Sequence, residues 1–145
     1  MTAASKRAGE SSSLVGTLGR DSLVLIWDDN GITIDAITDA TFTEDVRARY
    51  PAYGWRVHEI DTPTDLDALG ASLRGAAERT GRPTLVALRT VIGAPSVKFG
   101  GTSAAHSGGL GADELALVKT TMGFAPDVPC MTSSPPRPSS TPAAR

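Results

Sequence analysis

The chain has 145 residues, a formal net charge of −2 and 40% hydrophobic residues, which suffices for one domain or for part of a larger one. The slight acidic excess gives no support for nucleic-acid binding, and the single cysteine, Cys130, excludes an internal disulfide. No apolar stretch reaches the length of a membrane span, and the first residues lack the apolar core of a signal peptide. We therefore expect a cytoplasmic protein that binds neither nucleic acid nor membrane.

Composition divides the chain into three parts. Residues 1–9 are small and polar and are expected to form a flexible N-terminus, whereas residues 10–127 carry regular hydrophobic patterning. Residues 128–145 contain five prolines, four serines and no acidic residue. This tail cannot bury enough apolar surface to offset its ordering entropy, so we expect it to be disordered.

The patterned part alternates between helix and strand signals. The first half predicts the end of a helix over Ser11–Leu18, a strand covered on both faces over Leu23–Trp27, and a helix near Thr43–Arg49 with a Thr41–Glu44 capping box. The second half predicts a strand over Trp55–Ile60, a helix over Thr64–Thr80, a strand over Thr84–Arg89 and a helix over Asp113–Met122. Strands separated by helices in this way pair in parallel, which predicts an α/β fold with a doubly wound, mostly parallel sheet.

The end of the first expected strand is the most distinctive sequence, because its apolar residues are followed directly by Asp28, Asp29, Asn30 and Gly31. In open α/β sheets, ligands bind at the carboxyl ends of the strands. Oxygen-bearing side chains suit a hard cation such as Mg²⁺, and glycine lets the backbone approach a phosphate or a metal. Asp-Asn-Gly is also a common turn signal, so a turn without a ligand is the alternative interpretation.

A long glycine-bearing loop is expected after the third strand, from Gly93 to Gly111. Loops of this length inside compact domains are usually functional. His106 lies among small residues of this loop, where an imidazole can donate to a phosphate or move a proton. The alternative is a solvent-exposed histidine in a flexible loop. The other histidine, His58, is expected to be structural or exposed on its strand.

A collinear series of sequence blocks extends from about Glu10 to Asp127. The blocks are Glu10–Leu18, Trp27–Asp35, Phe42–Val46, Tyr53–Trp55, Arg82–Leu85, Arg89–Gly93, Ala105–His106, Leu110–Gly111 and Met122–Phe124. In this order they resemble the thiamine-diphosphate-binding domain of transketolases. The blocks after residue 35 distinguish transketolases from more distant thiamine-diphosphate enzymes, such as the 2-oxoacid dehydrogenases.

The resemblance implies roles for five positions. Asn30 matches an asparagine whose side-chain oxygen binds the divalent metal and which approaches the diphosphate, and Ile32 matches a residue whose main-chain carbonyl is a metal ligand. Ile34 and Ile92 match apolar residues that lie against the cofactor. His106 matches a histidine that contacts the diphosphate and faces the sugar substrate, so it is the candidate for catalysis, cofactor binding and substrate binding.

The activity implied by the resemblance is that of a transketolase, a transferase of the pentose phosphate pathway in carbohydrate metabolism. Such enzymes move a two-carbon ketol unit between sugar phosphates, using thiamine diphosphate and Mg²⁺ or another divalent cation such as Ca²⁺ or Mn²⁺. The cofactor performs the difficult chemistry, while the protein supplies orientation and electrostatics. The implied partners are sugar phosphates and either a second copy in a homo-oligomer or a complementary transketolase subunit.

Three features depart from the family pattern. The family carries a Gly-Asp-Gly segment upstream of its asparagine, with an aspartate that is a further metal ligand, and no such segment precedes Asn30. The second domain of the family is missing, and the sequence after Asp127 leaves the pattern as a truncated or frameshifted end would. We therefore expect a fragment, or one part of a split enzyme, that is inactive alone. A non-catalytic remnant or interaction module is the alternative.

Overall fold

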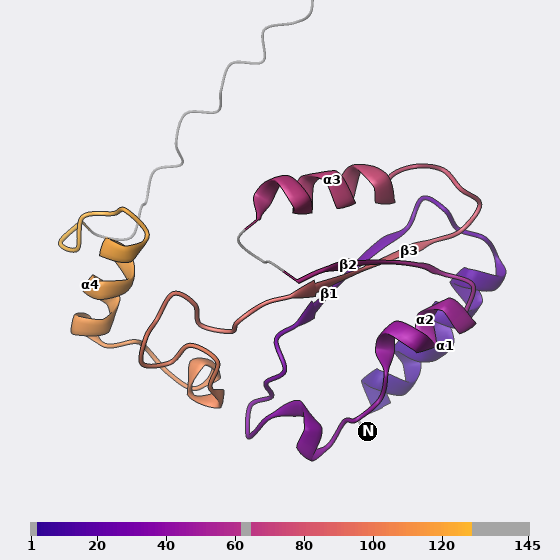
Figure 1. The fold of residues 1–145 in the computed structure, drawn as a ribbon. Coiled ribbons are helices and arrows are strands. Elements are labelled where there is room, and N and C mark those ends of the chain that lie inside the picture. Colours follow the sequence, from indigo (N-terminus) through magenta and orange to yellow (C-terminus); the bar gives the residue numbers. More distant parts are fainter. Residues whose placement is uncertain (1–2, 62–64, 129–145) are drawn as a thin grey trace, which may run out of the picture.

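The sheet is parallel and three-stranded in the computed structural model, which describes residues 3–61 and 65–128. Its strands are β1 (Val24–Asp29), β2 (Arg56–Ile60) and β3 (Thr84–Arg89), in the order β1-β3-β2. Thr84 of β3 lies opposite Val24 on one side and opposite Arg56 on the other. The carboxyl ends of all three strands therefore meet at one edge of the sheet (Figure 1).

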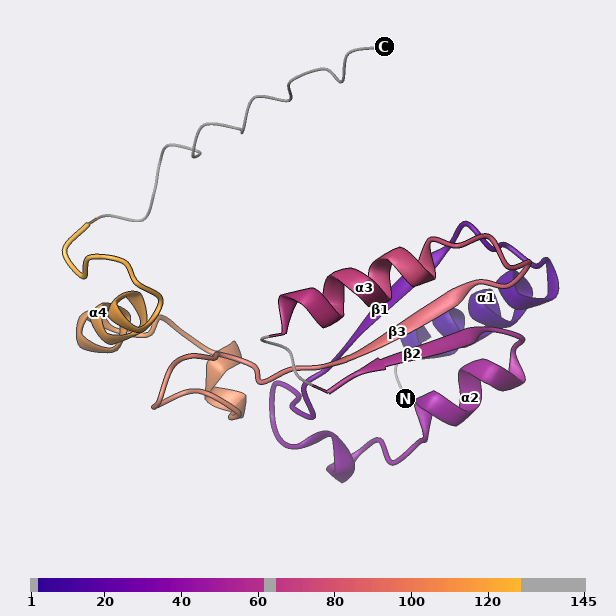
Figure 2. The ribbon, with the colours of Figure 1, turned by 45° about the horizontal axis from the view of Figure 1, so that its top comes forward.

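Helices cover both faces of this sheet. The helices are α1 (Ala3–Thr17), α2 (Val46–Ala52), α3 (Leu66–Ala76) and α4 (Ala112–Thr121). Helix α3 lies over one face and α1 and α2 lie over the other, whereas α4 lies beyond the carboxyl ends of the strands (Figures 1 and 2). None of the described helices is long and apolar enough to cross a membrane. The arrangement confirms the predicted α/β fold with helices on both sides of a parallel sheet.

The core consists of two clusters, one on each face of β3. On the face of α1 and α2, Trp55 is only 1% exposed, packs edge-on against Tyr50 and donates its indole N–H to the Ser12 carbonyl over 2.8 Å. The cluster on the face of α3 is made by Ile60, Ala76 and Val86. Burial of β3 on both faces explains why its bounds agree with the continuous apolar run in the sequence.

The N-terminus of α2 differs from the predicted capping box. Asp45 caps the helix by accepting a hydrogen bond from the backbone N–H of Ala48 over 2.9 Å, and Glu44 pairs with Arg49 over 2.6 Å. Thr41 instead closes a separate short turn, in which its N–H donates to the Thr38 carbonyl. The predicted Thr41–Glu44 capping box is wrong because the chain forms this separate turn before Asp45, and the helix begins only after Asp45.

One other expectation, the coverage of the first strand, changed with the tertiary arrangement. Strand β1 is not covered on both faces, since Leu25 is 38% exposed and Ile26 is 49% exposed, because the helices pack over β2 and β3. Helix α1 begins at Ala3 and so overlaps the segment 1–9, whose flexibility stays a prediction. Most of the tail that was expected to be disordered, residues 129–145, lies outside the described residues.

A close approach between α1 and the turn before β2 fixes how these elements pack. A β-carbon added at Gly16 would lie 1.7 Å from the carbonyl oxygen of Tyr53 and 3.2 Å from Cδ1 of Trp55. The first of these neighbours is backbone and cannot rotate away. Glycine at this position therefore lets α1 reach the core, at the expense of helix propensity.

Gly16→Ala is therefore expected to lower the free energy of unfolding by about 2 kcal/mol or more, although alanine favours a helix. Gly70→Ala in α3 is the matched control, because its added carbon would meet only the side-chain end of Arg74, at 3.3 Å. That variant should be unchanged or more stable by up to about 1 kcal/mol. Urea unfolding followed by tryptophan fluorescence measures both, and equal effects would contradict the packing argument.

Candidate functional site

A cavity of about 690 Å³ opens where β1 ends. Its lining comes from the end of β1, the loop that follows, the segment before α2, and one arginine each from α2 and β3. The lining residues are Trp27, Asp28, Asp29, Asn30, Gly31, Ile32, Ile37, Thr38, Asp39, Phe42, Thr43, Glu44, Arg47 and Arg89. A second hollow of about 400 Å³ shares Asn30, Gly31, Ile32, Ile37 and Arg89 with it, so the loop 30–32 lies between two recesses.

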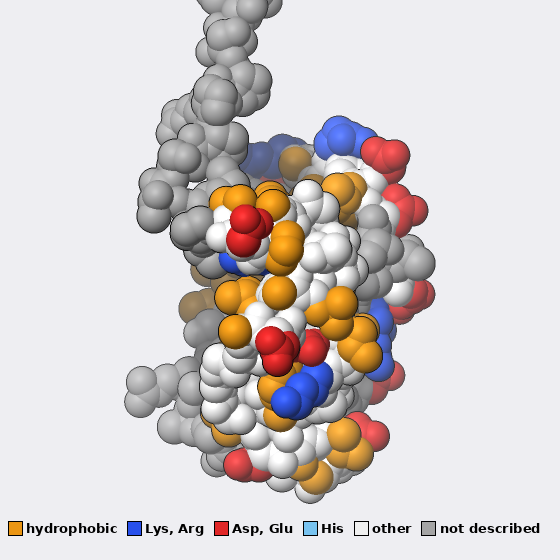
Figure 3. Space-filling view, turned by 90° about the vertical axis from the view of Figure 1, so that its left-hand side faces the viewer, with side chains coloured by type: hydrophobic (Ala, Val, Ile, Leu, Met, Phe, Trp, Pro, Cys, Tyr) orange, Lys and Arg blue, Asp and Glu red, His pale blue; other side chains and the backbone are white. Residues whose placement is uncertain are grey.

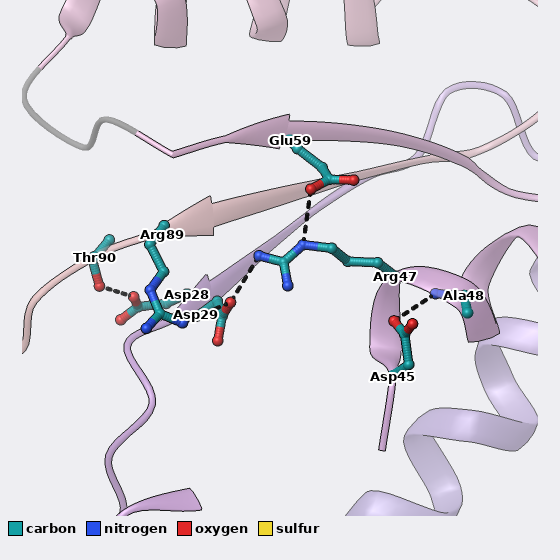
Figure 4. A network of polar contacts seen from close by, with 8 residues as sticks. All are labelled: Asp28, Asp29, Asp45, Arg47, Ala48, Glu59, Arg89 and Thr90. Atoms are coloured by element: carbon teal, nitrogen blue, oxygen red, sulfur yellow. Dashed lines mark hydrogen bonds and ion pairs between the residues drawn. The ribbon is translucent and has the colours of Figure 1, made fainter. Parts of the chain in front are cut away.

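An ion-pair network forms one wall of the cavity (Figure 4). Asp29 is only 9% exposed, and its Oδ2 accepts from Arg47 over 2.9 Å and from Arg89 over 3.3 Å. Nε of Arg47 lies 3.1 Å from a carboxylate oxygen of Glu59 on β2, and its guanidinium lies over the Trp27 ring. The network therefore connects α2 with all three strands at the edge where they end.

The Asn30 side chain is held at both ends of its amide. Its Nδ2 donates to Asp28 over 3.3 Å, and its Oδ1 accepts from the backbone N–H of Ile32 over 3.0 Å. The Thr90 hydroxyl donates to the other oxygen of Asp28. The two predicted metal ligands, Asn30 and Ile32, therefore lie beside each other, and an amide oxygen with one partner can still accept a second.

The other predicted site residues do not line either recess. Ile34 is 70% exposed in the loop between Thr33 and Ala36, and Ile92 is half-buried beyond the end of β3. His106 is exposed in a 3₁₀ helix over Ser103–His106, on the segment that leads to α4. The two metal-ligand candidates thus both line the recesses, whereas the two isoleucines and the histidine do not.

Carboxylate ligands are scarce for a metal at this place. Within residues 3–61 and 65–128, no three His, Cys, Asp or Glu side chains gather as a ligand cluster. Asp29 is engaged by two arginines, and Asp28 by Thr90 and Asn30. Neutral oxygens of Asn30 and of the backbone fit a hard cation in type, but they supply no charge to balance it.

Two arginines of the site were not predicted from the sequence. Arg89 lines both recesses, and its position directly at the end of the third expected strand could have indicated it. Arg47 gives no such signal, because its helix reaches the cavity only after folding. His58 is half-buried on β2 and its Nε2 lies 2.8 Å from Nη2 of Arg56, which suits the predicted structural role.

Comparison with known proteins assigns the chain and its fold to a family. Residues 5–134 match the family described as the thiamine diphosphate binding domain of transketolase. The chain belongs to the transketolase family. It is 45% identical over 121 residues to a transketolase of Scheffersomyces stipitis and 40% identical over 121 residues to one of Nostoc. Each alignment covers 83% of this chain and 18% of the relative, so the chain spans less than a fifth of these relatives.

Solved transketolase structures share the arrangement of helices and strands. A Pichia stipitis transketolase in complex with sedoheptulose-7-phosphate gives a TM-score of 0.79 with 44% identity, over 82% of this chain and 18% of that one. A transketolase from Leishmania mexicana gives 0.79 with 35% identity, over 82% and 18%. The transketolase resemblance and the fold class expected from the sequence are thereby confirmed.

Asp29→Asn is expected to lower the free energy of unfolding by about 1–3 kcal/mol, because it leaves Arg47 and Arg89 without their shared, largely buried carboxylate. Asp35→Asn, at an exposed loop position, is the matched control and should stay within about 0.5 kcal/mol of the unaltered chain. Urea unfolding at two salt concentrations measures both. If Asp29→Asn lowers the free energy of unfolding no more than the control does, the ion-pair network does not stabilise the fold.

Proposed function

We propose that this chain forms the metal- and thiamine-diphosphate-binding part of a transketolase-type enzyme, which transfers a two-carbon ketol unit between sugar phosphates. The observation that supports this most directly is the fixed Asn30–Ile32 pair in a cavity at the carboxyl end of a parallel strand. Ligands of open α/β sheets bind at this edge. Family membership and the sugar phosphate in a related structure support the substrate class.

The proposed roles follow from position and chemistry. The Asn30 side-chain oxygen and the Ile32 carbonyl would hold Mg²⁺ or another divalent cation such as Ca²⁺ or Mn²⁺. Thiamine diphosphate, when bound, supplies the chemistry for breaking and forming the carbon–carbon bond. Ile34 and Ile92 would contact this cofactor, and the high exposure of Ile34 suits a side chain that is covered only by a ligand or a partner.

His106 would donate hydrogen bonds to the diphosphate of the cofactor or to an oxygen of the substrate. An imidazole N–H can donate to the diphosphate or to a substrate oxygen, and in the protonated form both ring nitrogens donate. The exposure of His106 leaves its ring accessible to a substrate. We include in this proposal a cytoplasmic location and assembly either with a second copy or with a complementary transketolase subunit.

A non-catalytic interaction module is the second candidate function. It is favoured by β1, whose apolar side chains Leu25 and Ile26 are exposed on opposite faces of the sheet. A strand of this kind is normally covered by further structure. In this alternative the chain would pair with an intact homologue, and its cavity would bind no cofactor.

The ligand assignment predicts a ranking of cavity variants. Asn30→Ala should weaken Mg²⁺-dependent binding of thiamine diphosphate by about 100-fold or more, because it removes a ligand, and Asp28→Ala by about tenfold, because it removes only a partner of that ligand. Asp39→Ala, another carboxylate of the cavity wall, is the matched control and should change binding less than threefold (~0.6 kcal/mol). Calorimetric titration of the chain mixed with a complementary transketolase part measures the three affinities, and the opposite order of Asn30 and Asp28 would contradict the assignment.

Ketol transfer itself tests the catalytic proposal. The 145-residue chain, supplied with Mg²⁺, thiamine diphosphate, xylulose 5-phosphate and ribose 5-phosphate, should give no turnover, because two neutral ligands bind a divalent cation weakly. Turnover should arise on mixing with a complementary transketolase part and should be lost again with His106→Ala. Turnover by the chain alone would refute the first expectation. Absence of both cofactor binding and turnover in every mixture would favour the interaction module.

A further inference from the structure

The segment between β3 and α4 contains one buried polar side chain, whereas its other residues are half-buried or exposed. Ser96 is 6% exposed, whereas the next residue, Val97, is 84% exposed. The Ser96 hydroxyl donates to Oε1 of Glu114 over 2.5 Å and accepts from the backbone N–H of Phe99 over 3.0 Å. Burying a hydroxyl is unfavourable unless its hydrogen bonds are made, so these two contacts determine the local conformation.

Glu114 is the partner that α4 contributes from its first turn. The same oxygen that accepts from Ser96 also accepts from the backbone N–H of Lys98 over 3.1 Å. The Ser96 hydrogen bond, followed by that of Lys98, lowers the pKa of the Glu114 carboxyl below its ordinary value. The carboxylate form is therefore the one that binds the loop, and this contribution is complete above the ordinary glutamate pKa and is lost as the pH falls through the lowered value.

The loop folds tightly around this pair. A β-carbon added at Gly100 would lie 2.5 Å from the Ser96 carbonyl oxygen, and one at Gly93 would lie 3.0 Å from Cβ of Ala105. The backbone N–H of Gly101 donates to the carbonyl of Ile92 over 2.9 Å. The backbone N–H of Thr102 donates to the Phe99 carbonyl over 3.1 Å, and that of Ala105, which precedes His106, donates to the Thr102 carbonyl over 3.2 Å. The turn around Ser96 is thus linked by backbone hydrogen bonds to Ile92 and to Ala105.

Within residues 3–61 and 65–128, helix α4 makes no extensive contact with another helix or strand. Helix α4 and the loop lie beyond the sheet, away from α3 and α1 (Figure 1), and the surface seen from that side mixes apolar with charged side chains (Figure 3). Among the described residues, the hydrogen bonds between the α4 side chains and loop 93–110 all end on Glu114. Release of Glu114 would therefore remove the side-chain hydrogen bonds that join helix α4 to the loop.

We propose that Ser96 and Glu114 form a positioning pair that sets where Ile92 and His106 lie relative to the end of β3. The importance of this pair for function rests on the role proposed for His106. The contacts of Ser96 and Glu114 do not depend on that role. Neither side chain touches substrate or cofactor in this scheme. Both act by fixing the loop, so their loss should displace the imidazole without unfolding the sheet.

Nuclear magnetic resonance of the full chain tests this. Ser96→Ala and Glu114→Ala should each shift or broaden the imidazole signals of His106, leave those of His58 unchanged, and speed hydrogen exchange at the Phe99 and Gly101 amides by about tenfold or more. The double variant should add little to either, because the two residues act as a unit. Asp113→Asn, one residue away on the same helix turn, is the matched control and should change none of these signals.

Glu114→Gln separates positioning from a general loss of structure. Its amide oxygen can still accept from Ser96 without charge, so the His106 signals should lie between those of the unaltered chain and Glu114→Ala. Faster exchange in the loop with unmoved His106 signals would overturn the proposal. Simultaneous loss of the sheet amides, or of the His58 signals, in both Ser96→Ala and Glu114→Gln would also overturn it, by showing a role in overall folding.

Addition of thiamine diphosphate with Mg²⁺ distinguishes this proposal from the proposed function. If the additions leave His106 unchanged in the unaltered chain while Ser96→Ala still displaces its ring, the positioning pair stands and the assigned role of His106 fails. If the additions shift His106 equally in the unaltered chain and in Ser96→Ala, the pair does no positioning, although the proposed function stands. Loss of the shift in Ser96→Ala supports both.

Discussion

Parallel pairing of β3 with β1 and β2 determines where the polar side chains of the cavity can lie. Because the strands run in one direction, their last residues meet at one edge, and Asp29 comes opposite Arg89 in the β1–β3 register. The carboxylate and the guanidinium are thereby brought together with no loop needed to position them. Arg47 then enters from α2 and connects Asp29 to Glu59 on β2. The recess beside Asn30 is held open by this network on one side and by the loop 31–38 on the other.

The sequence was most informative where one physical requirement dominates. Strand β3 is buried on both faces over residues 84–87, and its apolar run, residues 85–88, lies one residue inside each end of the strand. Helix α3 has an amphipathic stripe and a capping aspartate, Asp65, and both place it within the expected range, although it ends at Ala76 rather than Thr80. The capping box before α2 misled because Thr41 and Glu44 find other partners once the chain has turned. Local patterns do not reveal such long-range competition.

In the candidate site, too, the local sequence indicated some residues, whereas others depend on partners far along the chain. Asp28, Asp29 and Asn30 were evident because polar residues end an apolar run, and they do line a cavity. The engagement of Asp29 by two arginines was not evident, since Arg47 and Arg89 lie 18 and 60 residues away along the chain. The Ser96–Glu114 contact is equally hidden, because a serine in a loop and a glutamate in a first helical turn each have a common local explanation. Side-chain partners that depend on the folded path of a loop need the structure.

The exposed faces of β1 bear on how the isolated chain behaves in solution. The chain has a formal net charge of only −2 and an isoelectric point near 5.6. Long-range repulsion between copies of the chain is therefore weak at neutral pH. Of the two carboxylates at the end of β1, Asp29 is neutralised by ion pairs with arginines, whereas Asp28 is not. Attraction between uncovered apolar strands therefore meets little electrostatic opposition. Colloidal stability should be poorest near the isoelectric point and should improve as the buffer is made more alkaline.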